Sequence, residues 1–197
     1  MYLLKISVYL FLVYLIGSIP FGYIITYLLK GFDIRTVGSH NIGATNVYRS
    51  VGHIAGLTVL ILDIGKGFFS VWMMKAVFNN TFLCLLAAIS AIAGHSLSIF
   101  LKFKGGRGVA TGCGAFFALA PLPMLISVVG FGVVLLFTRY ASLSSIVGVV
   151  IFPVSCLIFK QDRLIIYLSI VASCIIILRH FPNIKRLIKG TERKIKL

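Results

Sequence analysis

Long runs of hydrophobic residues separated by short polar segments dominate the pattern along this chain. The clearest apolar runs cover residues of about 4–30, 53–78, 82–101 and 163–181. A helix needs roughly 20 apolar residues to cross a bilayer, so each run is predicted to be a transmembrane helix. The first run is longer than the apolar core of a signal peptide and lacks an A-x-A-like cleavage site, so we expect it to be retained.

The apolar stretch 109–138 is long for one transmembrane helix and short for two. Pro121 and Pro123 lie near its middle, and proline inside a helix bends or ends it. The stretch is therefore predicted to form two short helices, at about 109–121 and 123–138.

A further helix is predicted at about 145–160, which completes an all-α, polytopic membrane protein with seven transmembrane helices. Composition agrees, because 59% of the residues are hydrophobic and 12% are charged, whereas soluble domains are about 45–50% apolar and about 25% charged. No polar stretch is long enough for a separate soluble domain, so residues 1–197 are expected to form a single domain.

The 19 Lys and Arg residues far outnumber the 4 Asp and Glu residues. Cytoplasmic loops of membrane proteins collect Lys and Arg, and basic surfaces also concentrate anionic substrates such as phosphates. We therefore predict a membrane setting and do not expect nucleic-acid binding. With the N-terminus outside and the C-terminus cytoplasmic, most cations fall on the inner side, and the outer side holds only Lys5, Lys75, Lys160 and Arg163.

This orientation also places the Gly- and Ser-rich polar segments on the cytoplasmic face. The first, GSHNIGATNVYRSVG, runs from Gly38 to Gly52 and contains no carboxylate. Its donors and positive charge suit an anion, and glycines let main-chain N–H groups approach a phosphate. The alternative is an ordinary loop in which Asn and Gly make turns. The candidate ligands are Ser39, His40, Asn41, Asn46 and Arg49.

The second segment, FKGGRGVATG, leads into the predicted helix at 109. A glycine loop that opens a helix favours anions, because free N–H groups and the helix dipole point at the ligand. The spacing is not that of a P-loop, and a tight basic loop that follows the charge rule is the alternative. The candidate phosphate ligands are Lys104, Gly105, Gly106, Arg107 and Gly108.

Ionisable residues inside a predicted helix add further candidates. Asp63 and Lys66 are spaced i, i+3 and can pair on one helix face. Such groups are usually functional, although a neutralised structural pair explains them equally well. His95 lies late in its predicted helix and makes either a contact between helices or part of a site.

Two later segments complete the set of candidate residues. Ser142 lies in RYASLSS, where a serine can also cap the next helix. His180 and Asn183 open the C-terminal segment, whose basic tail is typical of an anchor for anionic lipid. The cysteines stand singly in apolar runs without metal-ligand spacing, so we expect neither a metal nor another cofactor.

Three motifs taken together, GSHNIGATNVYR, GHSLSIFLKFKGGRGVATG and HFPNIKRLIKGTE, resemble the bacterial membrane acyltransferases that use acyl phosphate to acylate glycerol 3-phosphate. GSIPFGYI and DIGKG also fit, so the resemblance covers essentially the whole chain. It implies transfer of an acyl group from acyl phosphate to the 1-hydroxyl of glycerol 3-phosphate, giving lysophosphatidic acid and phosphate in the first step of phospholipid synthesis. It further implies seven helices in the bacterial plasma (inner) membrane, a cytoplasmic active site and other phospholipid-synthesis enzymes as possible partners.

The resemblance also implies roles for individual residues. Ser39 and Arg49 match essential residues of the family, the glycines of the second segment match its glycerol 3-phosphate site, and His180 and Asn183 match residues important for activity. The family often has Lys where this chain has Arg107. Both are cations, and Arg binds phosphate through two hydrogen bonds, so we expect the same role.

A mechanism follows as a hypothesis. Lys104, Arg107 and the N–H groups of the three glycines would hold glycerol 3-phosphate. The acyl phosphate would lie on Ser39, Asn41, Asn46 and Arg49, which would also stabilise the developing oxyanion. His40, Lys66, His95 and Ser142 complete the predicted substrate-binding set.

The sequence leaves the identity of the general base open. His40, His95 and His180 are candidates, and the phosphate of the acyl donor is another, because positioning alone can suffice for an activated substrate. The donor phosphate is favoured because no His–carboxylate pair is visible in the sequence. The competing class is a transporter of a small organic phosphate, but no internal repeat of the kind found in transporters is evident.

Overall fold

The computed structural model describes residues 1–195, and these form helices and connecting loops without a β-strand. The chain divides into two compact units, one from Met1 to Ala118 and one that begins at Leu119. The single domain expected for residues 1–197 stays a prediction.

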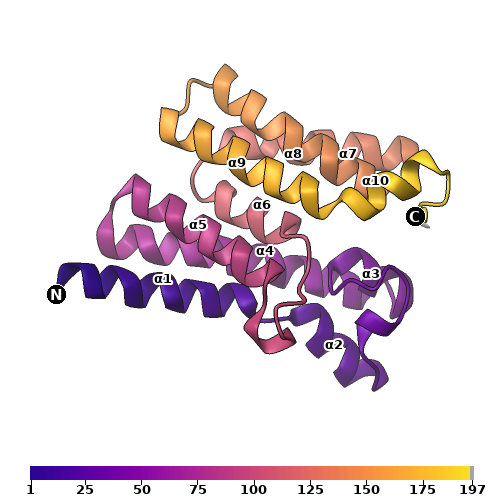
Figure 1. The fold of residues 1–197 in the computed structure, drawn as a ribbon. Coiled ribbons are helices and arrows are strands. Elements are labelled where there is room, and N and C mark those ends of the chain that lie inside the picture. The colour runs from indigo at the N-terminus through magenta and orange to yellow at the C-terminus, as the bar shows by residue number, and fades with distance from the viewer. Residues whose placement is uncertain (196–197) are drawn as a thin grey trace. The chain divides into compact units, whose positions relative to one another are not determined.

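The helices of the first unit run back and forth beside one another (Figure 1). Phe78, at the end of one long helix, stacks edge-on against Tyr9 near the start of the first helix, with ring centroids 5.3 Å apart. Near the other end of that first helix, the Tyr14 hydroxyl donates to the carbonyl of Leu97 at 2.7 Å. The elements are α1 (Tyr2–Ser18), α2 (Phe21–Lys30), η1 (Ile34–Thr36), α3 (Ala44–Ser50), α4 (His53–Phe78), α5 (Thr81–Ser96), η2 (Ile99–Leu101) and α6 (Val109–Phe117). Helix α1 therefore runs parallel to α5 and antiparallel to α4.

Glycines allow two helix pairs of this unit to approach closely. A Cβ atom on Gly17 or Gly94 would overlap main-chain atoms across the α1–α5 contact. A Cβ atom on Gly67 or Gly114 would do the same across the α4–α6 contact. Small residues at such contacts are typical of helices in membranes, where close van der Waals packing stabilises association.

The second unit contains α7 (Pro121–Thr138), α8 (Ala141–Ile158), α9 (Arg163–Arg179) and α10 (Phe181–Ile188). Serine hydroxyls connect its long helices: Ser127 donates to the Gly148 carbonyl at 2.6 Å and Ser173 to the Val149 carbonyl at 2.8 Å. The chain bends by 58° between α9 and α10. This bend falls at His180.

The prediction of an all-α membrane fold is confirmed. Five helical segments are long and apolar enough to cross a membrane, and the bent α9–α10 pair would make a sixth. Helix α6 has nine residues, which is too short to cross a bilayer alone. The seven-helix count and the orientation are therefore not confirmed and stay predictions.

The predicted break in 109–138 is present, but its position differs from the prediction. Helix α6 ends at Phe117 and α7 starts at Pro121, so the prolines lie inside the second helix rather than between two helices. Proline fits the first turn of a helix because its missing N–H has no intrahelical partner there. The predicted helix at 145–160 likewise begins earlier, at Ala141.

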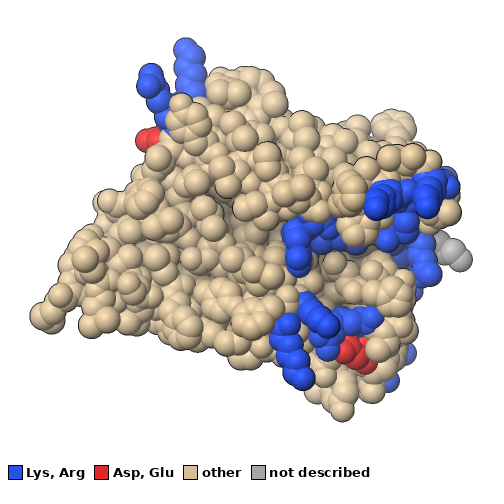
Figure 2. All heavy atoms as spheres, viewed as in Figure 1, with Lys and Arg blue, Asp and Glu red and all other residues tan. Residues whose placement is uncertain are grey.

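A small hydrophobic core at one end of the first unit contains residues of the first glycine-rich segment and one residue close to the second. Residues from η1, the loop before α3, α3, the first turns of α4 and η2 share this core, with members Ile34, Ile42, Val47, Ala55, Val59 and Leu101. Ile42 and Val47 belong to the first segment, and Leu101 lies two positions before the second. On the face drawn in Figure 2, Lys and Arg side chains gather over this end, whereas no charged side chain is visible over α1.

Candidate active site

The segment from Gly38 to Gly52 is organised around the buried amide of Asn46, which is 2% exposed. Its Nδ2 donates to the carbonyls of Ile34 and Val37 at 3.1 Å and of Asn41 at 2.9 Å. Its Oδ1 accepts from the N–H of Ser39 at 2.9 Å. Both amide hydrogens therefore face main-chain carbonyls of residues 34–41, so one side chain fixes the course of the chain from η1 into the loop.

Gly38 is required by this arrangement for two reasons. Its φ is +66°, in the left-handed region that favours glycine, and a Cβ atom there would overlap Oδ1 of Asn46. The sequence predicted that the loop's glycines let main-chain N–H groups approach a phosphate closely. At Gly38 the group that approaches the main chain closely is the side chain of Asn46.

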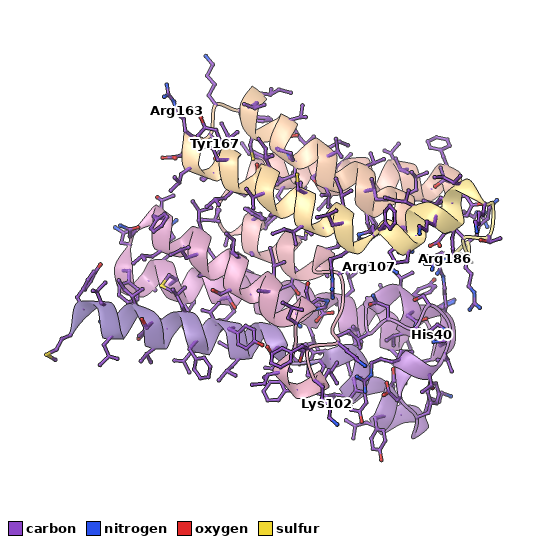
Figure 3. All side chains as sticks on the ribbon, viewed as in Figure 1. His40, Lys102, Arg107, Arg163, Tyr167 and Arg186 are labelled. Atoms are coloured by element: carbon purple, nitrogen blue, oxygen red, sulfur yellow. The ribbon has the colours of Figure 1, made fainter. Side chains whose placement is uncertain are left out.

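The other predicted residues of this segment surround the loop. Ser39 and Asn41 are half-buried, and Oδ1 of Asn41 accepts from the N–H of Gly43 at 2.8 Å. His40 is exposed on the loop before α3 (Figure 3), and its Nδ1 lies 2.9 Å from the Arg35 carbonyl. Arg49 is half-buried in the last turn of α3. The structure thus brings the predicted residues of the first segment into one short stretch of surface.

The loop from Lys104 to Gly108 is attached to the end of α5 by main-chain hydrogen bonds. The N–H of Gly105 donates to the Ser96 carbonyl at 3.2 Å, and that of Gly106 to the His95 carbonyl at 2.9 Å. The expectation that these two N–H groups bind glycerol 3-phosphate is therefore wrong, because they are already engaged with α5.

The two glycines instead allow this loop to lie directly on α5. A Cβ atom on Gly105 would overlap the His95 carbonyl, and one on Gly106 would overlap His95 Nε2. Gly108, with φ +84°, turns the chain into the first turn of α6. Lys104 is exposed. Arg107 is half-buried just before that helix begins (Figure 3).

Three ionisable side chains meet inside the first unit. Lys66 Nζ lies 2.8 Å from Asp63 Oδ1, which confirms the predicted pair. His95 Nδ1 lies 3.6 Å from the same carboxylate oxygen. The expectation that the chain has no His–carboxylate pair is therefore wrong. The Lys66 ammonium also donates to the Ile19 carbonyl at 2.8 Å, at the break between α1 and α2.

In the second unit, the carboxylate of Glu192 accepts hydrogen bonds from several polar side chains. Glu192 accepts from Ser142 Oγ at 2.8 Å, Asn183 Nδ2 at 2.8 Å and Arg186 Nε at 2.7 Å. Burial raises the pKa of the Glu192 carboxyl, but these three donors and the Arg186 charge outweigh it and hold that pKa below its ordinary value. Sequence reasoning missed Glu192, although it is one of only 4 acidic residues in the chain and stands in a strongly basic tail.

His180 and Asn183 lie at the bend between α9 and α10, and both are buried. His180 Nδ1 is 2.8 Å from the Ile176 carbonyl. The Oδ1 atom of Asn183 is buried and has no hydrogen-bond partner among the residues that the structure describes. Over the same range, no group of His, Cys, Asp and Glu side chains is arranged to hold a metal ion.

A family model described as glycerol-3-phosphate acyltransferase matches residues 7–190. The chain belongs to this family. It is 45% identical to the glycerol-3-phosphate acyltransferase of Desulforamulus reducens over 182 residues, which cover 92% of this chain and 91% of that protein. The enzyme of the same name from Endomicrobium trichonymphae is 44% identical over 195 residues, covering 99% of this chain and 98% of the relative.

Two crystal structures of PlsY (YgiH), an integral membrane glycerol 3-phosphate acyltransferase, also match. Its glycerol 3-phosphate form has a TM-score of 0.92 at 35% identity, and covers 98% of this chain and 96% of that chain. Its lysophosphatidic acid form has a TM-score of 0.89 at 34% identity, with the same coverage. The resemblance that the three motifs carry is thus confirmed for the glycerol-3-phosphate acyltransferase family.

Proposed function

We propose that this chain transfers an acyl group from acyl phosphate to the 1-hydroxyl of glycerol 3-phosphate, releasing lysophosphatidic acid and inorganic phosphate. Acylation of glycerol 3-phosphate follows from family membership, and the identity of the donor is our inference. The observation that carries it is the presence in the first unit of two cation-bearing, carboxylate-free loops, 38–52 and 104–108, the first on a core that includes Leu101, three positions before the second loop. Two such loops suit two phosphorylated substrates, because a carboxylate there would repel them.

Glycerol 3-phosphate is assigned to the second loop. Lys104 and Arg107 supply positive charge, and the first turn of α6 supplies main-chain N–H groups and the positive end of the helix dipole. Gly105 and Gly106 serve this site indirectly, because they let the loop lie on α5. Gly108 directs the chain into the helix.

The acyl phosphate is assigned to the first loop. Arg49 can hold the donor's phosphate through two parallel hydrogen bonds, and Ser39 and Asn41 supply further hydrogen-bonding groups toward the oxyanion that develops at the acyl carbon. Asn46 acts as a positioning residue in this scheme, because its amide hydrogens are directed at loop carbonyls.

In the second unit, Ser142, His180 and Asn183 keep their predicted roles. The buried, unpartnered Oδ1 of Asn183 supports this assignment, because a buried acceptor without a donor is costly unless a ligand supplies one. Glu192 orients Asn183 through Nδ2, which leaves Oδ1 as the available acceptor.

The proton of the attacking hydroxyl is assigned to the departing phosphate of the donor. His95 lies between Asp63 and Gly106, which suits a structural role, and His40 is exposed with Nδ1 on a main-chain carbonyl. A histidine replacement series distinguishes the two routes. A His→Ala variant that binds both substrates but does not turn them over would indicate a protein base instead.

The functional setting is proposed to be the bacterial plasma (inner) membrane, with seven transmembrane helices, an outer N-terminus and the site on the cytoplasmic face. The asymmetric distribution of Lys and Arg supports this orientation. Labelling of intact cells with a membrane-impermeant thiol reagent tests it in a background without native cysteines. A cysteine at Lys160 should react and one at Phe103 should not, and the reverse pattern would invert the orientation.

The deciding experiment uses detergent-purified protein with labelled glycerol 3-phosphate and one donor at a time. Labelled lysophosphatidic acid should form with acyl phosphate, and stoichiometric inorganic phosphate should appear. An Arg49→Lys variant keeps the charge but loses the paired hydrogen bonds, so its turnover should fall by about a hundredfold. Product formation from an acyl thioester but not from acyl phosphate would overturn the donor assignment.

A further inference from the structure

The proposed mechanism assigns no substrate contact to Asp63, Lys66 or His95, although Lys66 and His95 belong to the predicted substrate-binding set. The three residues are 2%, 5% and 3% exposed, respectively, so they are almost fully removed from solvent. Burying charged groups is costly unless they are paired and hydrogen-bonded. A cluster of this kind therefore needs an explanation in terms of what it connects.

Lys66 connects the cluster to the break between α1 and α2. Its Nζ atom reaches Asp63 Oδ1 and the Ile19 carbonyl, both at 2.8 Å, and lies 5.5 Å from the centre of the Phe21 ring. The ammonium thus satisfies a main-chain carbonyl at the point where the helix is interrupted by Pro20.

His95 connects the cluster to the loop assigned to glycerol 3-phosphate. One ring nitrogen, Nδ1, lies 3.6 Å from Asp63 Oδ1, a distance that suits an ion pair but is too long for a hydrogen bond. The other side of the ring, Nε2, occupies the space that a Cβ atom on Gly106 would need. The main-chain carbonyl of His95 also accepts from the Gly106 N–H at 2.9 Å. The orientation of this ring therefore determines where Gly106 can lie.

We propose that Asp63 is a positioning residue for glycerol 3-phosphate: its carboxylate orients His95, and His95 sets the position of the Lys104–Gly108 loop. This inference rests on the proposed function, because that function assigns the loop to glycerol 3-phosphate. The first loop is fixed independently by Asn46, so acyl phosphate binding does not depend on Asp63.

A simpler role for Asp63 would be to neutralise the buried Lys66. The double variant Asp63→Asn/Lys66→Met separates the two roles. It removes both charges together, so no lone charge stays buried, and Asn and Met approximate the volumes of the original side chains. If Asp63 only balances charge, the single variant Asp63→Asn has a kinetic defect that the double variant does not share. If Asp63 positions the loop, the double variant has the defect as well, because His95 has lost its carboxylate.

The experiment measures kcat and both KM values for the double variant, and equilibrium binding of labelled glycerol 3-phosphate in the absence of a donor. We expect the KM and the dissociation constant for glycerol 3-phosphate to rise by at least about tenfold, because small misplacements of binding groups have large effects. The KM for acyl phosphate should stay within about twofold. Wild-type values for glycerol 3-phosphate would overturn the inference.

Gly65→Ala is the matched control. Gly65 lies between Asp63 and Lys66 in the sequence, but a Cβ atom there meets nothing within 4 Å, so its kinetics should match those of the wild type. If the double variant fails to fold, His95→Gln is used instead, since Gln lacks the ring that faces Gly106. An unchanged glycerol 3-phosphate affinity in that variant would equally refute the positioning role.

The binding measurement uses no acyl donor, so it does not depend on the donor assignment. Wild-type protein that binds glycerol 3-phosphate but does not react with acyl phosphate would refute only the donor assignment.

Discussion

Asn46 in the first unit and Glu192 in the second are both buried and both bind several partners, but they organise different parts of the chain. Asn46 is neutral, and its hydrogen bonds join it to main-chain groups of η1 and of the chain between η1 and α3. Glu192 is an acid in the segment after α10, and its hydrogen bonds come from side chains on α8 and α10. The amide therefore defines a loop, whereas the carboxylate gathers functional side chains.

This difference determines how each centre should respond to change. A neutral centre that satisfies main-chain carbonyls is insensitive to pH but intolerant of any residue that cannot donate hydrogen bonds. A charged centre surrounded by donors tolerates the loss of one donor but depends on its own ionisation. The predictions below test this contrast in order of decreasing effect.

The largest effect is expected for Asn46→Asp. The new carboxylate has nearly the same shape but faces the carbonyls of Ile34, Val37 and Asn41 without a hydrogen to donate. The variant should lose about 3 kcal/mol, which lowers the Tm in detergent by roughly 6–12 °C for a chain of this size. Thermal unfolding followed by circular dichroism measures this shift.

Asn41→Asp is the control for that prediction, because it makes the same chemical change in the same loop. Oδ1 of Asn41 accepts from the Gly43 N–H, and an aspartate oxygen can accept there equally well. Its Tm should change by less than about 3 °C. Equal losses in the two variants would show that the loop does not depend on the donors of Asn46.

Glu192→Gln should have the next largest effect. Glutamine keeps one acceptor oxygen, but it removes the negative charge that strengthens the hydrogen bonds from Arg186, Asn183 and Ser142. Hydrogen bonds to charged groups are worth more than neutral ones, so we expect a loss of about 2 kcal/mol and a Tm lower by roughly 4–8 °C. The same thermal unfolding assay at neutral pH checks this value, and an unchanged Tm would contradict the role of the charge.

The pH dependence of that difference is a separate prediction. The pKa of Glu192 is lower in the folded protein than in the unfolded chain, so its ionisation stabilises the fold above the ordinary carboxyl pKa of about 4.3. This contribution should disappear as the pH falls through the lowered pKa. The Tm difference between wild type and Glu192→Gln should therefore be constant near neutral pH and shrink below about pH 4. A difference that grows on acidification would contradict the direction of the pKa shift.

Ser142→Ala should have the smallest effect. It removes one of three donors and leaves Asn183 and Arg186 on the carboxylate, so the expected loss is about 1 kcal/mol, or roughly 2–4 °C in Tm. Ser145→Ala is the control on the same helix, because its hydroxyl bonds only to the Ala141 carbonyl one turn back. If both variants behave alike, the link between Ser142 and Glu192 contributes nothing measurable.

Local patterns in the sequence were sufficient to predict the helices and the location of the polar segments. Apolar runs identified the helices because a segment in lipid must satisfy its own main-chain hydrogen bonds. The pair Asp63–Lys66 was also predictable, because residues three apart share a helix face. Boundaries were less accurate at Pro121, which starts a helix as readily as it ends one.

Contacts between distant parts of the chain could not be predicted in this way. His95 lies 32 positions after Asp63, and Glu192 lies 50 positions after Ser142. No periodicity connects such residues, and only the packing of α4 against α5, or of the C-terminal tail near α8, brings them together. The glycines at 105 and 106 show the same limit: their presence signalled a close approach, but the sequence did not reveal that the approaching group is α5 rather than a phosphate.

The glycine contacts between α1 and α5 and between α4 and α6 restrict where a lipid-like substrate can travel. At these crossings the main chains of neighbouring helices lie against each other without intervening side chains. A hydrocarbon chain therefore has no room to pass between α1 and α5 or between α4 and α6. Within the first unit, the acyl chain of the donor must therefore approach along some other surface. Substitution of one of these glycines by a larger residue would separate the helices and would not block a path for the acyl chain.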